Sequence, residues 1–213
     1  MDQTIKLKHL AARYDAAAKG WRDKIKSMGY PAAYESLISQ CFPTPVAGME
    51  VLDAGSGAGD FSKAYLDVGH QPKALTLLDI SSEMLRVAQQ ELRSRRVPII
   101  CAKGEIEALT KDTCFDLILC AHVIEHCENP LATIKILHGA LKPGGVLLLV
   151  ASKPHWCTSL IRLVWRHKAF TPAKIQAFLQ SAKFTHSASH SFKSGPPSRT
   201  SMGYVAHKKG ASS

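Results

Sequence analysis

The chain contains 213 residues, 46% of them hydrophobic, which suits one globular domain with a full core and requires no second domain. Its formal net charge of +10 favours an anionic partner, but no basic stripe interleaved with aromatic residues is present, so nucleic acid is not the expected one. No apolar run approaches the roughly 20 residues of a membrane span, and residues 1–8 lack the apolar core of a signal peptide, so we expect a cytoplasmic protein.

The N-terminal segment, residues 5–42, reads as helices that are interrupted near Gly20 and at residues 29–31. It is rich in aromatic residues, and aromatic side chains at helical spacing more often pack in a core than contact a ligand. Packing is therefore the first interpretation of Tyr14, Trp21, Tyr30 and Tyr34.

A glycine-rich stretch follows an apolar run at residues 51–54. Its sequence, Gly55-Ser56-Gly57-Ala58-Gly59, predicts a tight loop between a buried strand and a helix, because glycine adopts positive φ angles and lets a ligand approach the backbone. The unpaired N–H groups at the start of that helix can contact the ligand. The next apolar run ends at Asp79, where a carboxylate can bind the two hydroxyls of a ribose. Together these features indicate a nucleoside-containing ligand.

The rest of the central region alternates between helical and strand patterns. The expected bounds are 60–68, 81–95 and 130–141 for helices and 74–78, 98–102, 115–120 and 145–151 for strands, the last after a turn at 142–145. Such alternation predicts a parallel sheet, in which ligands bind beyond the carboxyl ends of the strands. That edge would gather the glycine loop, Asp79, Glu105 and Ala121.

Four segments of the core resemble the successive motifs of one enzyme family. In chain order they are 53–59, 78–85, 115–126 and 141–145. They resemble those of class I S-adenosylmethionine-dependent methyltransferases, in the UbiE-like, type 11 branch, whose members mostly methylate small molecules and lipids. The resemblance implies a Rossmann-like α/β fold, a doubly wound, mostly parallel seven-stranded sheet with an antiparallel last strand and added N-terminal helices.

The resemblance further implies a single methyltransferase domain over residues 1–213. Within it, residues 1–42 would form a helical cap over the cofactor. Residues 47–152 would form the cofactor-binding core. Residues 153–213 would supply the substrate-side helices and the last strands.

The C-terminal part contains several expected elements. Residues 156–168 read as an amphipathic helix that would pack on the core, close over a substrate or contact a membrane surface. Residues 172–182 predict a helix and residues 184–192 an alternating strand. A polar loop at 194–199 then leads to a strand near 201–207, which by resemblance is the reversed last strand of the sheet.

By resemblance, the chain has a defined set of cofactor-binding residues. The glycine loop would lie along the methionine part of S-adenosylmethionine, and Asp79 would bind the ribose. Glu105, in place of the family's usual Asp, would read the adenine with the Ile106 amide, and Tyr14 would close over the cofactor. The expected set is Tyr14, Asp53, Gly55, Ser56, Gly57, Gly59, Asp79, Ile80, Met84, Glu105, Ile106, Cys120 and Ala121.

Methyl transfer from a sulfonium is an in-line displacement, so positioning supplies most of the catalysis. A base is needed only when the acceptor keeps its proton, as an alcohol or a protonated amine does and an ionised thiol does not. His122, two residues beyond the fourth strand, is the first candidate base, because histidine titrates near neutral pH. A histidine that merely packs is the alternative. His155 and the capping residue Tyr14 complete the catalytic candidates.

The segment His122-Val123-Ile124-Glu125-His126 also matches H-x-x-E-H, a zinc-protease signature. It follows an expected strand rather than lying in a long helix, and no third ligand is evident. It also resembles the methyltransferases' own segment. We therefore expect no metal site.

The expected function is transfer of a methyl group from S-adenosylmethionine to a small-molecule acceptor. The positive charge and residues 156–168 motivate an alternative acceptor, a phospholipid headgroup or quinone precursor, reached by peripheral contact with an anionic membrane. An NAD-dependent dehydrogenase would share the glycine loop but gives no reason for the turn at 142–145. A non-catalytic binding module is disfavoured by the intact Asp53 and Asp79. The sequence does not indicate an oligomeric state.

Overall fold

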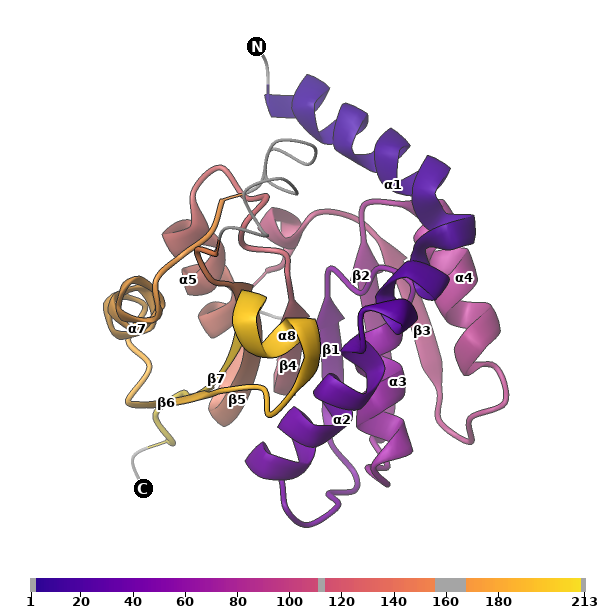
Figure 1. Cartoon of the computed structure of the whole chain (residues 1–213). Coiled ribbons are helices and arrows are strands. Elements are labelled where there is room, and N and C mark those ends of the chain that lie inside the picture. The colour runs from indigo at the N-terminus through magenta and orange to yellow at the C-terminus, as the bar shows by residue number, and fades with distance from the viewer. Residues whose placement is uncertain (1–2, 111–113, 156–167, 212–213) are drawn as a thin grey trace.

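The computed structural model describes residues 3–110, 114–155 and 168–211, which form a seven-stranded sheet with helices on both faces (Figure 1). The strand order is β3-β2-β1-β4-β5-β7-β6, and among these strands only β7 is antiparallel to its neighbours. The strands are β1 (Glu50–Ala54), β2 (Ala74–Asp79), β3 (Ile99–Lys103), β4 (Phe115–Ala121), β5 (Leu141–Ser152), β6 (His186–His190) and β7 (Ser201–His207). The expected Rossmann-like sheet with a reversed last strand is thereby confirmed.

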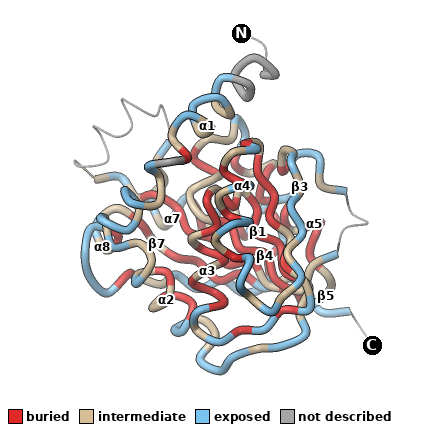
Figure 2. The backbone as a smooth tube through the Cα atoms, turned by 90° about the vertical axis from the view of Figure 1, so that its right-hand side faces the viewer, coloured by how far each residue is buried: buried red, intermediate tan, exposed pale blue. Residues whose placement is uncertain are grey.

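Helices cover the sheet in two layers, and a further helix lies across one edge. They are α1 (Gln3–Ser27), α2 (Tyr30–Cys41), α3 (Asp60–Asp67), α4 (Ser82–Leu92), α5 (Pro130–Ala140), α7 (Pro172–Ser181) and α8 (Gly195–Thr200), with a 3-10 turn at Ile106–Ala108. Helices α2, α3 and α4 contribute to the apolar layer on one face, and α5 and α7 to that on the other. Figure 2 shows the buried backbone concentrated in the strands between them. Helix α1 lies above the sheet in Figure 1.

The central strands are mostly apolar because both faces of the sheet are covered. Leu52, Leu75 and Ile118 are all fully buried. The register pairs Ala54 of β1 with Leu78 of β2. The glycine loop therefore begins beside Asp79, at the carboxyl edge of the sheet, where the sequence analysis expected both.

Side-chain caps fix the starts of three helices. Ser81 is the N-cap of α4, since its hydroxyl accepts a hydrogen bond from the Met84 amide at 3.0 Å. Asn129 and Thr171 cap α5 and α7 in the same way, each followed by a proline. Proline suits the first helical turn because its missing N–H would have no partner there.

The expected break near Gly20 is wrong, because α1 continues through it from Gln3 to Ser27. A glycine inside a helix costs only about 1 kcal/mol. Here α1 gains more than that from its contacts, since Tyr14 and Trp21 pack around a buried cluster that includes Ala18 and Met84. The expected interruption at residues 29–31 is present as Gly29, whose φ of 77° separates α1 from α2.

Two further expectations were wrong at the C-terminal side of the core. The turn expected at 142–145 lies within β5, where pairing with β4 shifts between Phe115 and Leu117 and Gly144 takes a φ of 79°. The polar loop expected at 194–199 is mostly the short helix α8, because its two prolines occupy the first helical turn.

The helix expected at 156–168 lies outside the described residues except for Lys168. In the part of the chain that the structure describes, no helix combines the length and the apolar character needed to cross a membrane.

Candidate functional site

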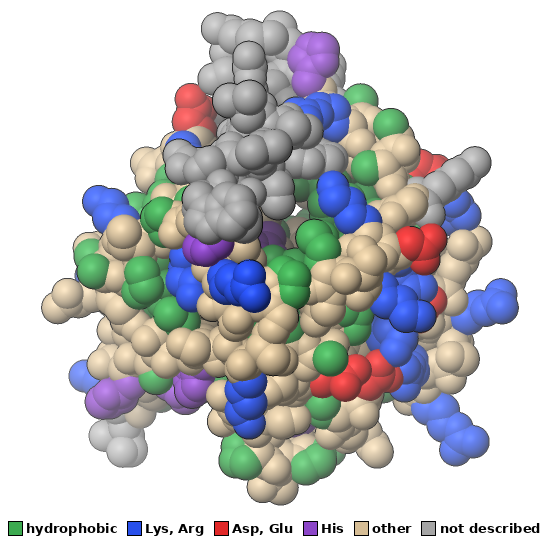
Figure 3. Space-filling model, viewed as in Figure 1, with side chains coloured by type: hydrophobic (Ala, Val, Ile, Leu, Met, Phe, Trp, Pro, Cys, Tyr) green, Lys and Arg blue, Asp and Glu red, His purple; other side chains and the backbone are tan. Residues whose placement is uncertain are grey.

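A cavity of about 990 Å³ lies at the carboxyl ends of β1, β2 and β4, and α1 forms one of its walls. Ligand pockets for small molecules usually measure about 300–1,000 Å³, so the space suits a nucleoside-sized ligand together with a second molecule. Lys and Arg side chains are spread over the face shown in Figure 3, in keeping with the net charge of +10.

The glycine loop and Asp79 form one wall of the cavity. The amides of Gly55 and Ser56 donate to the Leu78 carbonyl at 2.7 and 3.0 Å, which ties the loop to the end of β2. The Asp79 carboxylate accepts from the Gly57 and Ser81 amides, both at 2.8 Å. Burial raises the pKa of Asp79, and the hydrogen bonds from backbone amides oppose that rise. The loop and the acid thus act as one structural unit.

Asp53 lies beneath this loop and is almost fully buried. The Ser62 hydroxyl donates to its Oδ2 at 2.6 Å. Burial raises its pKa from 3.8 to about 7, because the bond from Ser62 only partly offsets the loss of water and Asp79 adds repulsion. A proton on Asp53 is therefore held far more tightly in the folded chain than in the unfolded one.

We expect Asp53→Asn to reduce the pH dependence of stability between 3.8 and about 7. In that window the folded protein keeps a proton that the unfolded chain has released, so the free energy of unfolding of the wild type falls as pH rises. The Asn side chain does not titrate and can still accept from Ser62. Urea unfolding of the ligand-free proteins at pH values of about 5 and about 8 measures this. The same loss of stability in both proteins would contradict the assignment to Asp53.

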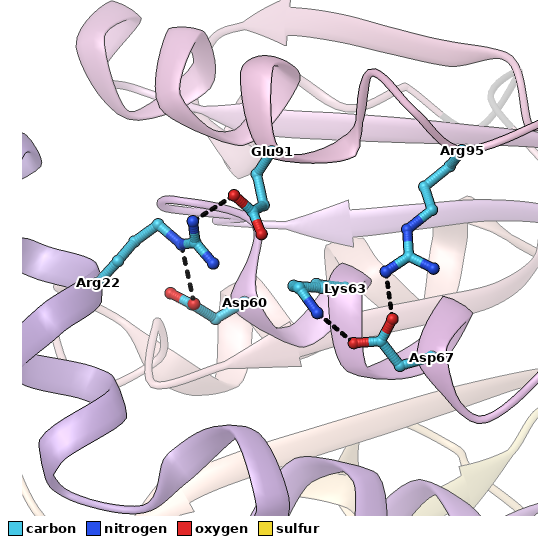
Figure 4. A network of polar contacts seen from close by, with 6 residues as sticks. All are labelled: Arg22, Asp60, Lys63, Asp67, Glu91 and Arg95. Atoms are coloured by element: carbon cyan, nitrogen blue, oxygen red, sulfur yellow. Dashed lines mark hydrogen bonds and ion pairs between the residues drawn. The ribbon is translucent and has the colours of Figure 1, made fainter.

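Helix α1 is anchored above the cavity by polar contacts at three points. The Tyr14 hydroxyl lies 3.2 Å from His126 Nε2, and Asp15 accepts from the Ser81 hydroxyl and from the Glu83 amide. Farther along the helix, Arg22 pairs with Asp60 of α3 and Glu91 of α4 (Figure 4). Burial, followed by the charges of Asp79 and Glu125, raises the pKa of Tyr14, so its hydroxyl stays protonated.

The end of β3 contributes the wall expected to face adenine. Glu105 precedes the 3-10 turn and Ile106 is buried within it, and both line the cavity. The neighbouring Glu107 also lines the cavity and accepts from the Thr133 hydroxyl at 3.1 Å. Glu107 therefore has a defined partner in α5, in addition to its cavity-facing position.

His122, just after β4, has a left-handed backbone with a φ of 59°. Its amide donates to the Val150 carbonyl at 2.9 Å, and its ring lies edge-on to Tyr30 with centroids 5.3 Å apart. Its Nδ1 is 3.2 Å from both Glu125 Oε1 and the Ser152 hydroxyl. Its Nε2 is buried and has no hydrogen-bond partner among the described residues.

Glu125 is a buried carboxylate next to this histidine. Its Oε1 accepts from the Ser152 amide at 2.6 Å. Burial alone would raise the pKa of Glu125, but the contact with His122 and the hydrogen bond from the Ser152 amide hold that pKa below its usual value. Glu125 is therefore ionised at neutral pH.

The structure brings most of the expected site residues to the cavity. Those that line it are Tyr14, Asp53, Gly55, Ser56, Gly57, Asp79, Ile80, Met84, Glu105, Ile106, Ala121 and His122. Gly59, Cys120 and His155 are not among the lining residues. Gly59 instead allows a close approach to α4, since a Cβ there would lie 3.0 Å from that of Ala88. Cys120 is fully buried in the core, and His155 is half-buried after β5.

Sequence reasoning missed four prominent lining residues, namely Tyr30, Tyr34, Glu125 and Ser152. The two tyrosines read as packing residues, and Tyr34 does pack in the core while also reaching the cavity. A signal for the other two existed. The ends of β4 and β5 are neighbours in a parallel sheet, so polar residues just after one and at the end of the other should meet.

The H-x-x-E-H segment forms turns rather than a helix, so its two histidines are not stacked one helical turn apart. His126 contacts Tyr14, whereas His122 contacts Glu125 and Ser152. Among the described residues, no group of three or more His, Cys, Asp or Glu side chains is arranged to hold a metal ion.

Residues 52–149 match a family model described as a methyltransferase domain. Ubiquinone biosynthesis O-methyltransferases from Xanthomonas campestris pv. campestris and Coxiella burnetii are 34% and 31% identical to the chain over 104 and 151 residues, which are 48% and 68% of it. The matches cover 42% and 62% of those proteins, so the chain spans less than two thirds of the length of these curated relatives.

Solved structures share the fold over nearly the whole chain. Magnesium protoporphyrin IX methyltransferase from Synechocystis, with bound S-adenosylmethionine, superposes with a TM-score of 0.75 at 18% identity and covers 98% of both chains. A Thermotoga maritima protein described as a possible histamine N-methyltransferase gives 0.72 at 16% identity, covering 94% of this chain and 100% of that one. Residues 52–149 therefore resemble the methyltransferase domain family, and the chain shares the Rossmann-like fold of these solved methyltransferases.

Proposed function

We propose that the protein is an S-adenosylmethionine-dependent methyltransferase that acts on a small-molecule acceptor. The observation that supports this proposal most strongly is the hydrogen bond between the glycine loop and the Asp79 carboxylate. The two lie at neighbouring strand ends and line a cavity of about 990 Å³. This pairing offers backbone amides and a buried acid to a nucleoside, as parallel sheets commonly do at this edge. The family match over residues 52–149 supports the same conclusion.

The proposed binding mode follows from the cavity wall. The backbone at Gly55 and Gly57 would lie along the methionine part, and Asp79 would accept hydrogen bonds from the ribose hydroxyls. Glu105 and the Ile106 amide would bind the adenine. Tyr14 would cover the ligand from α1, where its bond to His126 fixes the ring.

S-adenosylmethionine, when bound, supplies a methyl group on a sulfonium centre. The chain's part is to hold the acceptor about 3 Å from that methyl group and in line with the departing sulfur. Tyr30, Tyr34 and His122 line the cavity and would form the acceptor side. Helix α1 would keep water out through its anchors on α3 and α4.

A quinone precursor at a membrane surface is the second candidate acceptor. Two observations favour it, namely that the relatives are named ubiquinone biosynthesis O-methyltransferases and that α1 lends aliphatic and cationic residues to the cavity. These residues are Leu10, Arg13, Lys24 and Ile25. In this case the protein would be cytoplasmic and peripheral to the membrane, with an anionic lipid surface as its partner.

Transfer of labelled methyl from S-adenosylmethionine into a cell extract that contains membranes tests both candidates. We expect label in product, in the aqueous phase for a soluble metabolite and in the organic phase for a quinone precursor or lipid. A trap for volatile product prevents a methylated thiol from being missed. Binding competition between S-adenosylmethionine and NAD is the control for a dehydrogenase. Tighter binding of NAD, with no label transferred, would contradict the proposal.

A further inference from the structure

A buried polar contact joins the ends of β4 and β5 beside the cavity. The Glu125 side chain is 1% exposed and that of His122 is 25% exposed. One carboxylate oxygen, Oε1, lies beside the His122 ring and also accepts from the Ser152 amide. The residues come from adjacent parallel strand ends, so the sheet itself fixes their relative positions.

This contact determines which ring nitrogen of His122 carries the proton. An ionised carboxylate only accepts hydrogen bonds, so the His122 nitrogen beside Glu125 must be the donor. That nitrogen is Nδ1. In the neutral ring, Nε2 is then an unprotonated acceptor. Nε2 has no partner among the described residues, and the ring lines the cavity.

The backbone of His122 supports a functional reading of this contact. A non-glycine residue with positive φ is uncommon and costs of order 1–3 kcal/mol. Here two contacts hold the strained conformation, namely the hydrogen bond from the His122 amide to the Val150 carbonyl and the contact of its ring with Tyr30. The Tyr30 hydroxyl lies 2.9 Å from that of Ser201. These contacts fix the position of the His122 ring beside the cavity.

We propose that Glu125 is a positioning residue that holds His122 as the base for an acceptor that still carries its proton, a proposal that rests on the function proposed above. His122 Nε2 takes the proton of the acceptor heteroatom while that atom forms its bond to the methyl carbon. The methyl–sulfur bond breaks and its electron pair stays on sulfur, so the sulfonium charge is replaced by that of the imidazolium. An acceptor that arrives already ionised, such as a thiolate, would not need this device.

The tautomer of His122 is the direct test, measured on the full chain labelled with 15N-histidine at pH about 8, where histidines are mostly neutral. We expect the wild type to show the proton on Nδ1, with and without S-adenosylmethionine, and a His122→Gln variant assigns the signal. Glu125→Ala removes Oε1, the oxygen beside Nδ1, and leaves the Ser152 hydroxyl, which can donate to Nδ1 as well as accept from it. The proton should therefore no longer be fixed on Nδ1, and a substantial share of the molecules should carry it on Nε2.

Two matched variants separate positioning from a general effect on the cavity. Glu107→Ala makes the same chemical change on a cavity residue whose partner is Thr133, and should leave the His122 tautomer unchanged. Ser152→Ala removes the other side-chain contact of Nδ1 and should also leave the proton there. If Glu125→Ala does not fold, the wild-type tautomer alone decides, because a proton on Nε2 in the wild type would overturn the proposal.

Calorimetry and turnover complete the test. We expect Glu125→Ala to keep the wild-type Kd for S-adenosylmethionine and to lower the rate of methyl transfer into the extract by about 100-fold or more, the usual contribution of a general base. Absence of S-adenosylmethionine binding by the wild type would overturn the proposed function. Binding together with an unchanged tautomer or an unchanged rate in Glu125→Ala would overturn the positioning role alone.

Discussion

Replacing Asp79 with Ala is expected to weaken binding of S-adenosylmethionine by about thirtyfold, which corresponds to about 2 kcal/mol. A hydrogen bond to a charged group contributes about 1.5–3 kcal/mol, and in the proposed binding mode the carboxylate accepts from the ribose. The substitution also removes the acceptor that holds the Gly57 and Ser81 amides, so the glycine loop would lose its link to the start of α4. Isothermal titration calorimetry measures the affinity.

Asp116→Ala is the matched control for this experiment. Asp116 also accepts from a backbone amide, that of Glu50, and from the Lys142 ammonium, each at 2.8 Å. It lies near the start of β4, at the amino ends of the strands, whereas the cavity lies at their carboxyl ends. We expect Asp116→Ala to lower stability and to leave the affinity unchanged. Equal affinities for Asp79→Ala and the wild type would place the ligand elsewhere.

The positions of the glycine loop and Asp79 could be predicted because they follow from a rule about sheets. Apolar runs that are covered on both faces form parallel strands, and their carboxyl ends meet at one edge. The register of β1 and β2 then leaves little freedom, since Ala54 lies beside Leu78. The reversal of β7 was expected from the family resemblance alone.

Which residues at the end of a fully buried strand face the cavity could not be predicted. Cys120 and Ala121 are both small and apolar, and successive side chains of a strand point to opposite faces. Ala121 lines the cavity, whereas Cys120 packs in the core on the side of α5. When both faces of a strand are apolar, the sequence carries no alternation that would tell these two positions apart.

Contacts between distant segments account for the other differences. Gly20 reads as a helix break until α1 is seen to pack on Met84 and to pair with α3 and α4 through Arg22. The partnership of His122 with Glu125 and Ser152 depends on the side-chain directions just after β4, where His122 takes a positive φ. Such a conformation is selected by the surrounding fold and is not encoded by local propensity.

The close approach of Gly55 to Val123 gives the second large expected effect. Gly55 has a φ of 74°, and a Cβ at this position would lie 2.3 Å from Val123 Cγ2. We expect Gly55→Ala to lower the free energy of unfolding by about 3 kcal/mol, because it combines backbone strain of about 1 kcal/mol with overpacking of about 2 kcal/mol. Urea unfolding of the ligand-free protein measures the loss, and titration with S-adenosylmethionine should show that binding is lost as well.

Two further variants separate the strain from the clash. Gly144→Ala is the matched control, since Gly144 has a φ of 79° but a Cβ there would have open space, so only the backbone cost of about 1 kcal/mol is expected. Adding Val123→Ala to Gly55→Ala removes the two methyl groups that lie 2.3 and 3.1 Å from the new Cβ. The double variant should therefore recover most of the difference between Gly55→Ala and Gly144→Ala, after correction for Val123→Ala alone. If Gly55→Ala and Gly144→Ala lowered the free energy of unfolding equally, the close contact with Val123 would not explain the need for glycine at the start of the loop.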